Sequence, residues 1–518
     1  MSTTHRIRFL PGGKTVTVSD GTTLYEAARG AFAMPDAVCG GNGTCGKCAL
    51  DRIENGERTR VLACQTAVTR DMTVCLPERA AERIVLSGAC GASFPLTAAD
   101  GYAAAFDVGT TTLVCYLLDR KTGRQLASAG ALNPQASFGA DVITRAKHAL
   151  ENGAAALRDA ALSGMNRLLG EVTASAGVPQ TEITLCSIVG NSCMQHLLLD
   201  LPLRSLVTAP YVPFSTDAVV TNAASLGLHA HPDAPVRVLP LIGGFIGADT
   251  VGCLLATDIA RLPGNTLLLD IGTNGELVLN AGGKRLACSA AAGPALEGGR
   301  ICCGMRGAEG AIDRVRLTDG VPACSVIGGG RPAGLCGSGL IDLIARLLET
   351  DMIDAGGRMR DTGPLAPRMR HIDGMRAFEI ASGHESGTGR PLLLTQRDVR
   401  EVQLAKSAIA SGIGILTDAA GLRAADIDRV LLAGAFGNSL DAASACAIGL
   451  IPGCLRDRVH PVGNAAGEGA KLAALSDDAF AFSKALARGT APIDTAADPS
   501  FQKRFLDGLA FPAAPAQT

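Results

Sequence analysis

Four cysteines near the start of the chain have the spacing of metal-cluster ligands. Cys39, Cys45 and Cys48 lie in one glycine-rich stretch, and Cys64 follows later. Four thiolates can hold a two-iron, two-sulfur cluster, and the glycines allow a tight loop that turns backbone amides toward sulfur. Zinc is the alternative, because C-x2-C pairs also occur in zinc ribbons. A ribbon normally has two such pairs and this chain has one, so we favour the [2Fe–2S] cluster.

Two further stretches, roughly 160 positions apart, share a pattern suited to phosphate. Each consists of an apolar strand, a turn that carries aspartate, glycine and threonine, and a second strand. The aspartates of the two turns are Asp107 and Asp270. The amides and hydroxyls of such turns suit phosphate oxygens, and each aspartate can hold a metal-bound water or orient an attacking water. A repeat of this length predicts two similar domains that clamp a triphosphate between them.

A third glycine turn, in residues 430–438, ends an apolar strand and precedes an expected helix. The small-residue loop 288–298 follows the second aspartate turn, so its backbone could approach the same ligand. Any one such turn alone is more often an ordinary tight hairpin; the three in this order predict nucleotide binding. The predicted contact residues for ATP and Mg²⁺ are Gly109, Thr110, Thr111, Thr112, Gly272, Thr273, Asn274, Glu276, Gly293, Gly434 and Gly437, with Asp107 and Asp270 as the catalytic residues.

Length and composition bound the possibilities. The chain has 518 residues, 47% of them apolar and 19% charged, which predicts several well-buried globular domains. The net charge of −2 argues against nucleic acid or an anionic membrane as a partner. We expect a cytoplasmic protein, because the start has no signal core and no apolar run is long enough to span a membrane. The thirteen other cysteines are expected to be small buried hydrophobes.

The elements that must position these residues follow from periodicity. Residues 5–10 and 14–18 alternate as a β-hairpin, and a helix capped by Asp20 or Thr22 follows, with a stripe that includes Phe32. Strands near 47–53 and 72–76 complete a small β-grasp domain.

Further along the chain, residues 83–86 predict a short strand inside a linker that lets this domain move. His196 is expected to be structural, and Asn191 or Ser192 to cap a helix. Another helix opens at Pro240–Asp249 and is expected to run to about Arg261, and Thr395 begins a helix that runs to Leu416. A glycine-bearing helix start is expected in 463–475, and disorder from Ala510.

The predicted architecture is multidomain α/β. Its parts are a two-iron β-grasp domain (1–79), a linker (80–103), a first ribonuclease-H-like lobe (104–265), a second ATP-binding lobe (266–500) with an insertion near 351–394, and a tail (501–518).

Residues 39–48 with 62–66 and 74–77 resemble two-iron ferredoxins, and the three glycine turns resemble those of the actin/hexokinase/heat-shock-chaperone superfamily. In combination they resemble the reductive activators of corrinoid proteins that serve methyltransferases and O-demethylases. The resemblance implies ATP-dependent transfer of one electron to cobalt(II), an external low-potential electron donor, a corrinoid methyl-carrier protein as partner and a possible homodimer. One departure is Ser192-Cys193, where another small polar pair is expected.

Two other functions stay open on the sequence. A small-molecule kinase of the same superfamily would need a sugar or acid pocket with a catalytic carboxylate, for which we find no signature. An electron-transfer module that binds nucleotide only as a regulator would lack partner-stimulated ATP turnover. Activators of acyl-CoA dehydratases use related lobes but hold a four-iron cluster between subunits, and the ferredoxin pattern argues against them.

Overall fold

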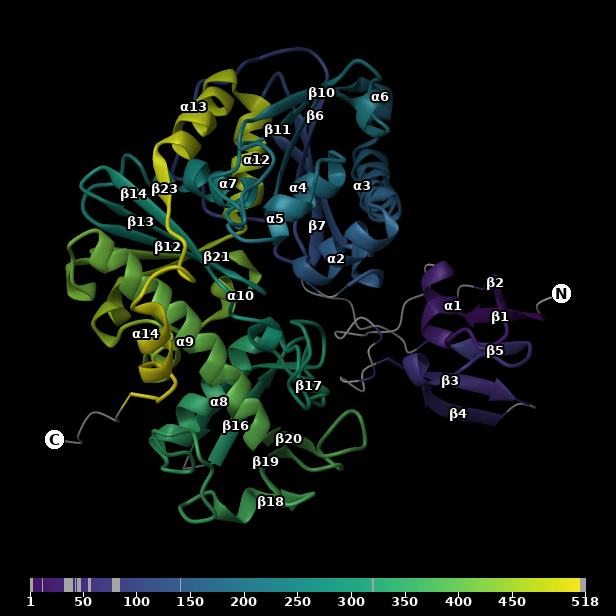
Figure 1. The fold of residues 1–518 in the computed structure, drawn as a ribbon, viewed down its shortest axis with the longest axis vertical. Helices are drawn as coiled ribbons and strands as arrows, with labels where there is room; N and C mark the ends of the chain where they lie inside the picture. Colours follow the sequence, from purple (N-terminus) through teal and green to yellow (C-terminus); the bar gives the residue numbers. More distant parts are fainter. Residues whose placement is uncertain are drawn as a thin grey trace. The chain divides into compact units, whose positions relative to one another are not determined.

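The computed structural model describes residues 3–512 except 12, 32–40, 42, 44–47, 55–56, 77–83, 140 and 319–320. It also leaves out the side chains of residues 30, 435 and 438. The chain divides into two compact units, residues 1–80 with 132–164 and residues 81–131 with 165–518. Figure 1 shows both. Within the described residues, no helix is long and apolar enough to cross a membrane.

The first unit begins with a five-stranded sheet in the order β2-β1-β5-β3-β4. Its strands and helix are β1 (Thr4–Leu10), β2 (Lys14–Ser19), α1 (Leu24–Gly30), β3 (Ala49–Glu54), β4 (Glu57–Leu62) and β5 (Met72–Cys75). β1 and β5 are parallel and the other pairs antiparallel. Because Ile7, Phe9 and Val74 alternate with polar residues, their side chains share the buried face that also receives Leu24 of α1. The predicted hairpin and both later strands are confirmed, whereas β4 was not anticipated.

The cap of α1 differs from the prediction. Neither Asp20 nor Thr22 caps the helix; Thr23 does, and its hydroxyl accepts the amide of Glu26 at 3.1 Å. The Glu26 carboxylate accepts the amide of Thr23 in return, which completes a capping box. Phe32, assigned to the apolar stripe of this helix, lies outside the described residues.

The second unit contains two six-stranded sheets, in the orders β10-β11-β9-β6-β7-β8 and β22-β21-β12-β13-β14-β23. They share a plan of five strands and differ in the sixth, which is β10 beside β11 in one sheet and β23 beside β14 in the other. The first has β6 (Tyr102–Val108), β7 (Thr112–Asp119), β8 (Gln125–Leu132), β9 (Ile183–Gly190), β10 (Val219–Asn222) and β11 (Pro235–Val238). The second has β12 (Thr266–Ile271), β13 (Gly275–Ala281), β14 (Lys284–Ala290), β21 (Arg429–Ala433), β22 (Val459–Gly463) and β23 (Thr490–Pro492). In each sheet, the first strand of a hairpin pairs antiparallel with the second strand and parallel with a third strand on its opposite edge. These first strands are β6, between β7 and β9, and β12, between β13 and β21. The predicted duplication is thus present at the level of strand order.

Two helices pack closely where the sheets meet (Figure 1). α7 (Ala248–Thr257) and α12 (Ala465–Leu475) approach at Gly252 and Gly469, and a methyl group on Gly469 would overlap the backbone of Gly252. Both helices were predicted. α7 ends at Thr257, short of the expected end near Arg261, and Asp258 follows in the left-handed conformation.

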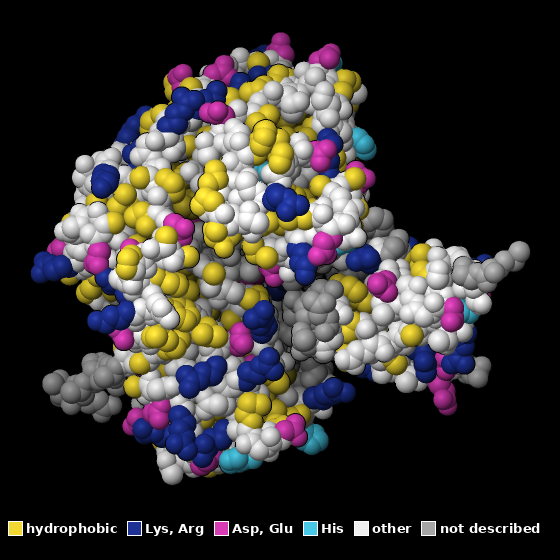
Figure 2. Space-filling model, in the orientation of Figure 1, with side chains coloured by type: hydrophobic (Ala, Val, Ile, Leu, Met, Phe, Trp, Pro, Cys, Tyr) yellow, Lys and Arg dark blue, Asp and Glu magenta, His cyan; other side chains and the backbone are white. Residues whose placement is uncertain are grey.

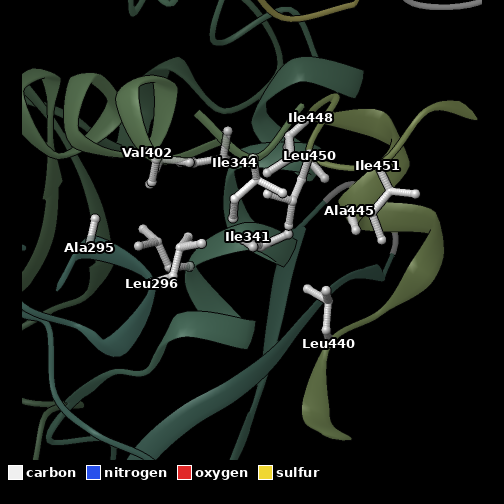
Figure 3. Close-up of a cluster of buried hydrophobic side chains, with 14 of the residues drawn as sticks. Ala295, Leu296, Ile341, Ile344, Val402, Leu440, Ala445, Ile448, Leu450 and Ile451 are labelled. Atoms are coloured by element: carbon white, nitrogen blue, oxygen red, sulfur yellow. The ribbon is translucent and has the colours of Figure 1, made fainter. Parts of the chain in front are cut away.

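Further helices occur in both units. They are α2 (Val142–Asn152), α3 (Ala155–Ala176), α4 (Ser192–Leu198), α5 (Arg204–Val207), α6 (Ala223–Leu226), α8 (Gly337–Glu349), α9 (Gln396–Ala419), α10 (Gly434–Ser439), α11 (Ala442–Ala447), α13 (Asp477–Arg488) and α14 (Phe501–Asp507). Thr395 caps α9 through a capping box with Asp398, and Asn191 caps α4, as predicted. Figure 3 shows part of the buried core that α8, α9 and α11 share.

The segment 351–394, predicted to be a peripheral insertion with little pattern, contains a three-stranded sheet. It consists of β18 (Met369–Ile372), β19 (Met375–Ala381) and β20 (Leu392–Thr395), and a second small sheet has β15 (Ala311–Thr318), β16 (Val321–Val326) and β17 (Gly334–Leu335). Figure 2 shows basic and acidic side chains mixed where β18 lies. Arg370 pairs with Glu379 and Arg376 with Asp361.

The described part of the predicted linker is attached to the second unit. The amide of Ala89 donates to Val462 O at 2.8 Å, that of Gly91 to Ala256 O at 2.8 Å, and that of Thr97 to Leu475 O at 2.9 Å. The expected strand at 83–86 is wrong for the described residues 84–86, which form no strand. The backbone of this segment makes separate hydrogen bonds to residues near the ends of α7, β22 and α12. Its described residues do not pair along one neighbouring strand.

The tail also differs from its prediction where it is described. Residues Phe501–Asp507 form α14, which packs on α9, and the Ser407 hydroxyl donates to Phe505 O at 2.5 Å. Disorder from Ala510 is wrong for residues 510–512. The ammonium of Lys406 donates to Ala510 O, and Phe511 is buried.

Candidate functional site

Two of the four predicted cluster ligands lie together in the first unit. The sulfur atoms of Cys48 and Cys64 are 3.1 Å apart, and the amide of Cys64 donates to Cys48 Sγ at 3.5 Å. Cys48 immediately precedes β3, and Cys64 lies in the 3-10 turn Ala63–Gln65 that follows β4. The β3–β4 hairpin therefore brings together two thiols that are distant in sequence. Cys39 and Cys45 lie outside the described residues.

The chemistry of this pair suits a thiolate-bound cluster. Cys48 is fully buried, and an amide directed at its sulfur is the kind of hydrogen bond that stabilises thiolate charge beside iron. Two glycines of the loop, Gly41 and Gly43, have φ angles of 89° and 76°, which L residues rarely adopt. The expected tight winding of the loop is therefore seen at these two positions.

The two aspartate turns close the corresponding hairpins of the two sheets. In the first, the amide of Gly109 donates to Thr112 O at 2.9 Å; in the second, the amide of Gly272 donates to Asn274 O at 2.9 Å. Asp107 lies on β6 and Asp270 on β12, each near the end of the strand that enters its turn. Glu276 faces Asp270 across the second hairpin as its register partner.

A glutamate connects the tips of these hairpins. Glu297 Oε2 accepts the hydroxyl of Thr273 at 2.8 Å and that of Thr111 at 3.4 Å. Thr111 belongs to the β6–β7 turn and Thr273 to the β12–β13 turn. The two turns, remote in sequence, thus face one another across a shared space. Thr110 lies in the same first turn and Thr112 is the first residue of β7, although Glu297 bonds Thr111.

Asp107 has a partner that the sequence did not reveal. The side-chain amide of Asn464 donates to Asp107 Oδ2 at 2.9 Å and to the Tyr116 hydroxyl at 3.2 Å. Its carbonyl oxygen accepts the amide of Gly467 at 2.8 Å and so caps α12. The sequence predicted a helix start in 463–475, and an asparagine at such a start is a typical cap residue. That pattern could have identified Asn464 as a cap, but not its contact with Asp107.

The carboxylates of this space resist ionisation. Burial raises the pKa of Asp107 to about 7, against a smaller lowering from its Asn464 hydrogen bond. Burial, followed by the negative charges of Asp249 and Asp107, raises the pKa of Asp270 to about 7. Burial also raises the pKa of Asp249 to about 6 and that of Glu276 well above its usual range. A divalent cation bound beside these carboxyl groups would favour their ionised forms, because its positive charge stabilises the carboxylates.

Among the described residues, no three His, Cys, Asp or Glu side chains are grouped so that they could hold a metal ion. Mg²⁺ commonly keeps several waters and binds through one or two carboxylates plus substrate phosphates. The acidic space between the turns fits that mode, in which phosphate oxygens complete the coordination.

The glycines assigned to the nucleotide occupy different environments. Gly434 has φ 82°, and a Cβ there would lie 2.6 Å from Asp270 Oδ1, so only glycine permits α10 to start this close to the aspartate. Gly437 is buried against Leu432 of β21. Gly293, with φ 73°, has open space where a Cβ would point.

Two more residues near Asp270 were missed. Asp249 is in the first turn of α7, inside the stretch that was read only as a helix start. Cys253, one helical turn later, donates its thiol to Asp270 Oδ2 at 3.8 Å. Its burial together with the nearby carboxylates raises the pKa of this thiol, so it stays a neutral donor.

The remaining cysteines are not uniformly buried. The prediction holds for Cys115, Cys186, Cys193, Cys253, Cys288, Cys336 and Cys446. It is wrong for Cys90, Cys302 and Cys454, which are exposed, and Cys75, Cys303 and Cys324 are intermediate. His196 is structural as predicted, because Nδ1 bonds Ser192 O at 2.7 Å and Nε2 accepts the amide of Phe214 at 3.1 Å.

Comparison with known families divides the chain in three. Residues 8–69 match a 2Fe-2S iron–sulfur cluster binding domain, residues 102–262 the middle region of RACo, and residues 264–518 the C-terminal domain of RACo, described as the ASKHA domain. The predicted fold class, a two-iron β-grasp domain ahead of actin-like α/β lobes, is confirmed.

Individual relatives agree. The chain is 32% identical to the corrinoid activation enzyme RamQ of Eubacterium limosum, over 94% of this chain and 96% of the relative. It is 24% identical to a [Co(II) methylated amine-specific corrinoid protein] reductase of Methanosarcina barkeri, over 68% of this chain and 66% of the relative. A solved structure of a reductive activator for corrinoid, iron–sulfur protein matches with a TM-score of 0.73 and 29% identity, covering 98% of each chain.

Proposed function

This chain belongs to the family of reductive activators of corrinoid proteins, and from that premise we propose that it uses ATP and one electron to return the cobalt(II) of a corrinoid protein to cobalt(I). Its cofactor is a [2Fe–2S] cluster, and ATP with Mg²⁺ is its second substrate. The electron acceptor is the corrinoid cobalt of a methyl-carrier protein.

The need for ATP follows from the reduction potentials of the cluster and of the corrinoid cobalt. A plant-type two-iron centre lies near about −400 mV, and every ~59 mV that an electron moves uphill lowers the equilibrium constant about tenfold. A cobalt(II) corrinoid of lower potential would receive almost no electrons unaided. ATP binding or hydrolysis can favour the closed arrangement of the two lobes, and a partner complex that alters the cobalt's axial ligation would bring its potential within reach.

Within the first unit, the chain's own contribution is ligation and shielding. We assign Cys39, Cys45, Cys48 and Cys64 as the ligands; the cluster, when bound, supplies one electron at low potential. The contact between Cys48 and Cys64 supports this assignment. The buried Cys48 and the amide of Cys64 would limit water access and stabilise thiolate charge.

Within the second unit, the two facing turns are the proposed phosphate clamp. Backbone amides of the turns, with Thr110 and Asn274, would contact phosphate oxygens, and Thr111 and Thr273 belong to the same clamp. Asp107 and Asp270 would orient the attacking water or hold a metal-bound water. The bond of Glu297 to both turns supports this proposal, because it shows that their hydroxyls reach one common point.

The electron must come from outside the chain. ATP hydrolysis supplies no electrons, and one cluster accounts for the four assigned ligands. We therefore propose an external low-potential electron donor. We also retain the possible homodimer as a proposal.

The decisive experiment is anaerobic and spectroscopic. The protein, reduced with titanium(III) citrate and freed of excess reductant, is mixed with a cobalt(II) corrinoid methyl carrier from the same organism, with Mg-ATP, with Mg-ADP or without nucleotide. We expect the cobalt(I) absorption band only with Mg-ATP. A normally reduced cluster with no cobalt(I) for any available carrier would contradict the proposed function.

A further inference from the structure

The carboxylate of Glu297 sits where an anionic substrate is expected, and it is bonded to both sides of the clamp. One oxygen, Oε2, accepts a hydroxyl from Thr273 at 2.8 Å and from Thr111 at 3.4 Å. The other oxygen, Oε1, lies 3.5 Å from the position that a Cβ on Gly272 would occupy. A methyl group at 272 would therefore be in ordinary van der Waals contact with this carboxylate.

The backbone that carries Glu297 is anchored in the core. Glu297 ends the 3-10 turn Pro294–Glu297, and the preceding Ala295 and Leu296 are buried at 1% exposure each. Figure 3 shows these two side chains in the same hydrophobic cluster as Ile341, Ile344 and Val402. The side chain of Glu297 thus extends into the clamp from a fixed support.

The residue after it also allows little change of position. Gly298 has φ 76°, and a Cβ there would overlap the backbone oxygen of Met305. The turn is therefore held by a close backbone approach on one side and by core packing on the other. A carboxylate supported in this way keeps its place when the clamp fills.

The donors and acceptors of the two threonine hydroxyls determine which ligands they can bind. A hydroxyl has one proton to donate and two lone pairs. Because Thr111 and Thr273 donate their protons to Glu297, their oxygens face the clamp as acceptors. An acceptor cannot bond an unprotonated phosphate oxygen, but it can bond Mg²⁺ or a water molecule. Threonine hydroxyls are ligands of this kind at other phosphate sites.

We propose that Glu297 is a positioning residue for ATP hydrolysis, which fixes the hydroxyl orientation of Thr111 and Thr273 so that both oxygens can coordinate Mg²⁺ or accept a hydrogen bond from its bound water. This inference rests on the proposed function and refines the earlier assignment of these threonines to the phosphates. Glu297 thereby couples cation binding to the meeting of the two turns, since a single carboxylate reaches both.

The test compares E297Q with wild type in steady-state ATP hydrolysis at varied Mg²⁺, with the reduced protein and the cobalt(II) carrier present. Glutamine keeps the size but can donate as well as accept, so it no longer imposes the orientation. We expect the Mg²⁺ concentration for half-maximal rate to rise at least tenfold. The affinity for ATP measured in EDTA should be unchanged or tighter, because one negative charge is gone. The exposed Glu309, mutated as E309Q, is the matched control and should behave as wild type.

A double-mutant cycle separates action through the threonines from direct action. If Glu297 works by orienting hydroxyls, E297Q should change the Mg²⁺ requirement less than twofold when Thr111→Val and Thr273→Val are already present. A full, additive effect in that background would overturn the proposal. So would an E297Q variant whose Mg²⁺ requirement equals that of wild type.

The variant E297D and thermal unfolding measurements distinguish a loss of stability from a loss of the positioning role. E297D keeps the carboxylate on a shorter side chain, so it should retain more Mg²⁺-dependent activity than E297Q at equal or lower stability. The reverse order would contradict the inference. Wild-type protein that never hydrolyses ATP with any carrier would overturn the proposed function itself, whereas an active wild type with an unimpaired E297Q overturns only the role of Glu297.

Discussion

Asp107 and Asp270 are carboxyl groups whose usual ionisation is suppressed chiefly by burial, with a smaller contribution from the negative charge of Asp249. In both, the pKa is raised to about 7. A neutral acid near pH 7 must lose its proton when a cation or an attacking water requires the carboxylate. Binding of Mg-ATP should therefore release protons and strengthen as the pH rises from 6 to 8.

The same pKa shift makes a prediction about stability. Because the folded pKa of Asp270 is raised from 3.8 to about 7, the native state holds the proton longer than the unfolded state. The free energy of unfolding of the nucleotide-free protein therefore falls as the pH rises through this interval. Asp270→Asn removes this term and should be more stable than wild type at pH 8, by about 2 kcal/mol. Denaturant unfolding at several pH values measures the difference.

The control for that experiment is the exposed Asp233, replaced by Asn. This change should leave the pH profile of stability as in wild type. Asp270→Asn should also abolish ATP-dependent cobalt(I) formation yet leave the cluster spectrum intact. An Asp270→Asn variant with the wild-type pH profile would show that this carboxyl is not desolvated.

Cys48 offers the sharpest test of the cluster. Cys48→Ser removes a buried thiol that contacts Cys64, and serine is a poor substitute for thiolate ligation of iron. We expect at least a tenfold loss of the visible absorbance and of the reduced-state EPR signal. Cys75→Ser is the control, because Cys75 lies on β5 of the same domain and its thiol bonds Leu76 O instead. Equal loss in both variants would contradict the ligand assignment.

At the scale of elements, the crossing of α7 and α12 depends on two glycines. The helices approach so closely at Gly252 and Gly469 that any side chain at 469 meets backbone. α7 carries Asp249 and α12 begins at Asn464, the partner of Asp107. The spacing of these helices thus sets the distance between parts of the acidic space.

Gly469→Ala should therefore destabilise the protein although alanine is the better helix former. We expect a loss of about 1–3 kcal/mol, because the methyl group must push the two helices apart. Gly170→Ala in α3 is the matched control. Its nearest neighbour would be Gln180 Nε2 at 3.5 Å, so it should gain up to about 1 kcal/mol from helix propensity. Thermal unfolding compares them; equal stabilisation by both would mean that the crossing is not tight.

At the scale of the whole molecule, the two chemistries belong to different units. Cys48 and Cys64 lie in the first, and the aspartate turns lie in the second. Each unit has its own buried core, and we expect each to bind its group independently of the other.

Ligand linkage tests this independence. At a free Mg-ATP concentration of one hundred times Kd, binding stabilises the native second unit by about 2.7 kcal/mol, which should raise its Tm. We expect this rise in wild type and in Cys48→Ser, and its loss in Asp270→Asn. Differential scanning calorimetry resolves the transitions. A Cys48→Ser protein that no longer responds to Mg-ATP would show instead that the cluster domain is part of the nucleotide site.

Much of the chemistry was legible in the sequence because its signals are local. Cysteine spacing, the two aspartate turns and the third glycine turn depend on neighbouring residues, and so do the hairpin β1–β2, the cap at Thr395 and the helix that it begins. Strand periodicity likewise predicted the duplicated lobes, since each copy repeats one strand–turn–strand pattern.

Only the tertiary structure decided which distant residues meet in the site. Asn464 reaches Asp107 from 357 positions away, and Glu297 joins Thr111 to Thr273 across 186 and 24 positions. No periodicity encodes such a contact, because it depends on how two sheets and the helices α7 and α12 pack. The same holds for the raised pKa values of Asp107 and Asp270: the residue types were visible in the chain, but desolvation is a property of the space that the fold encloses.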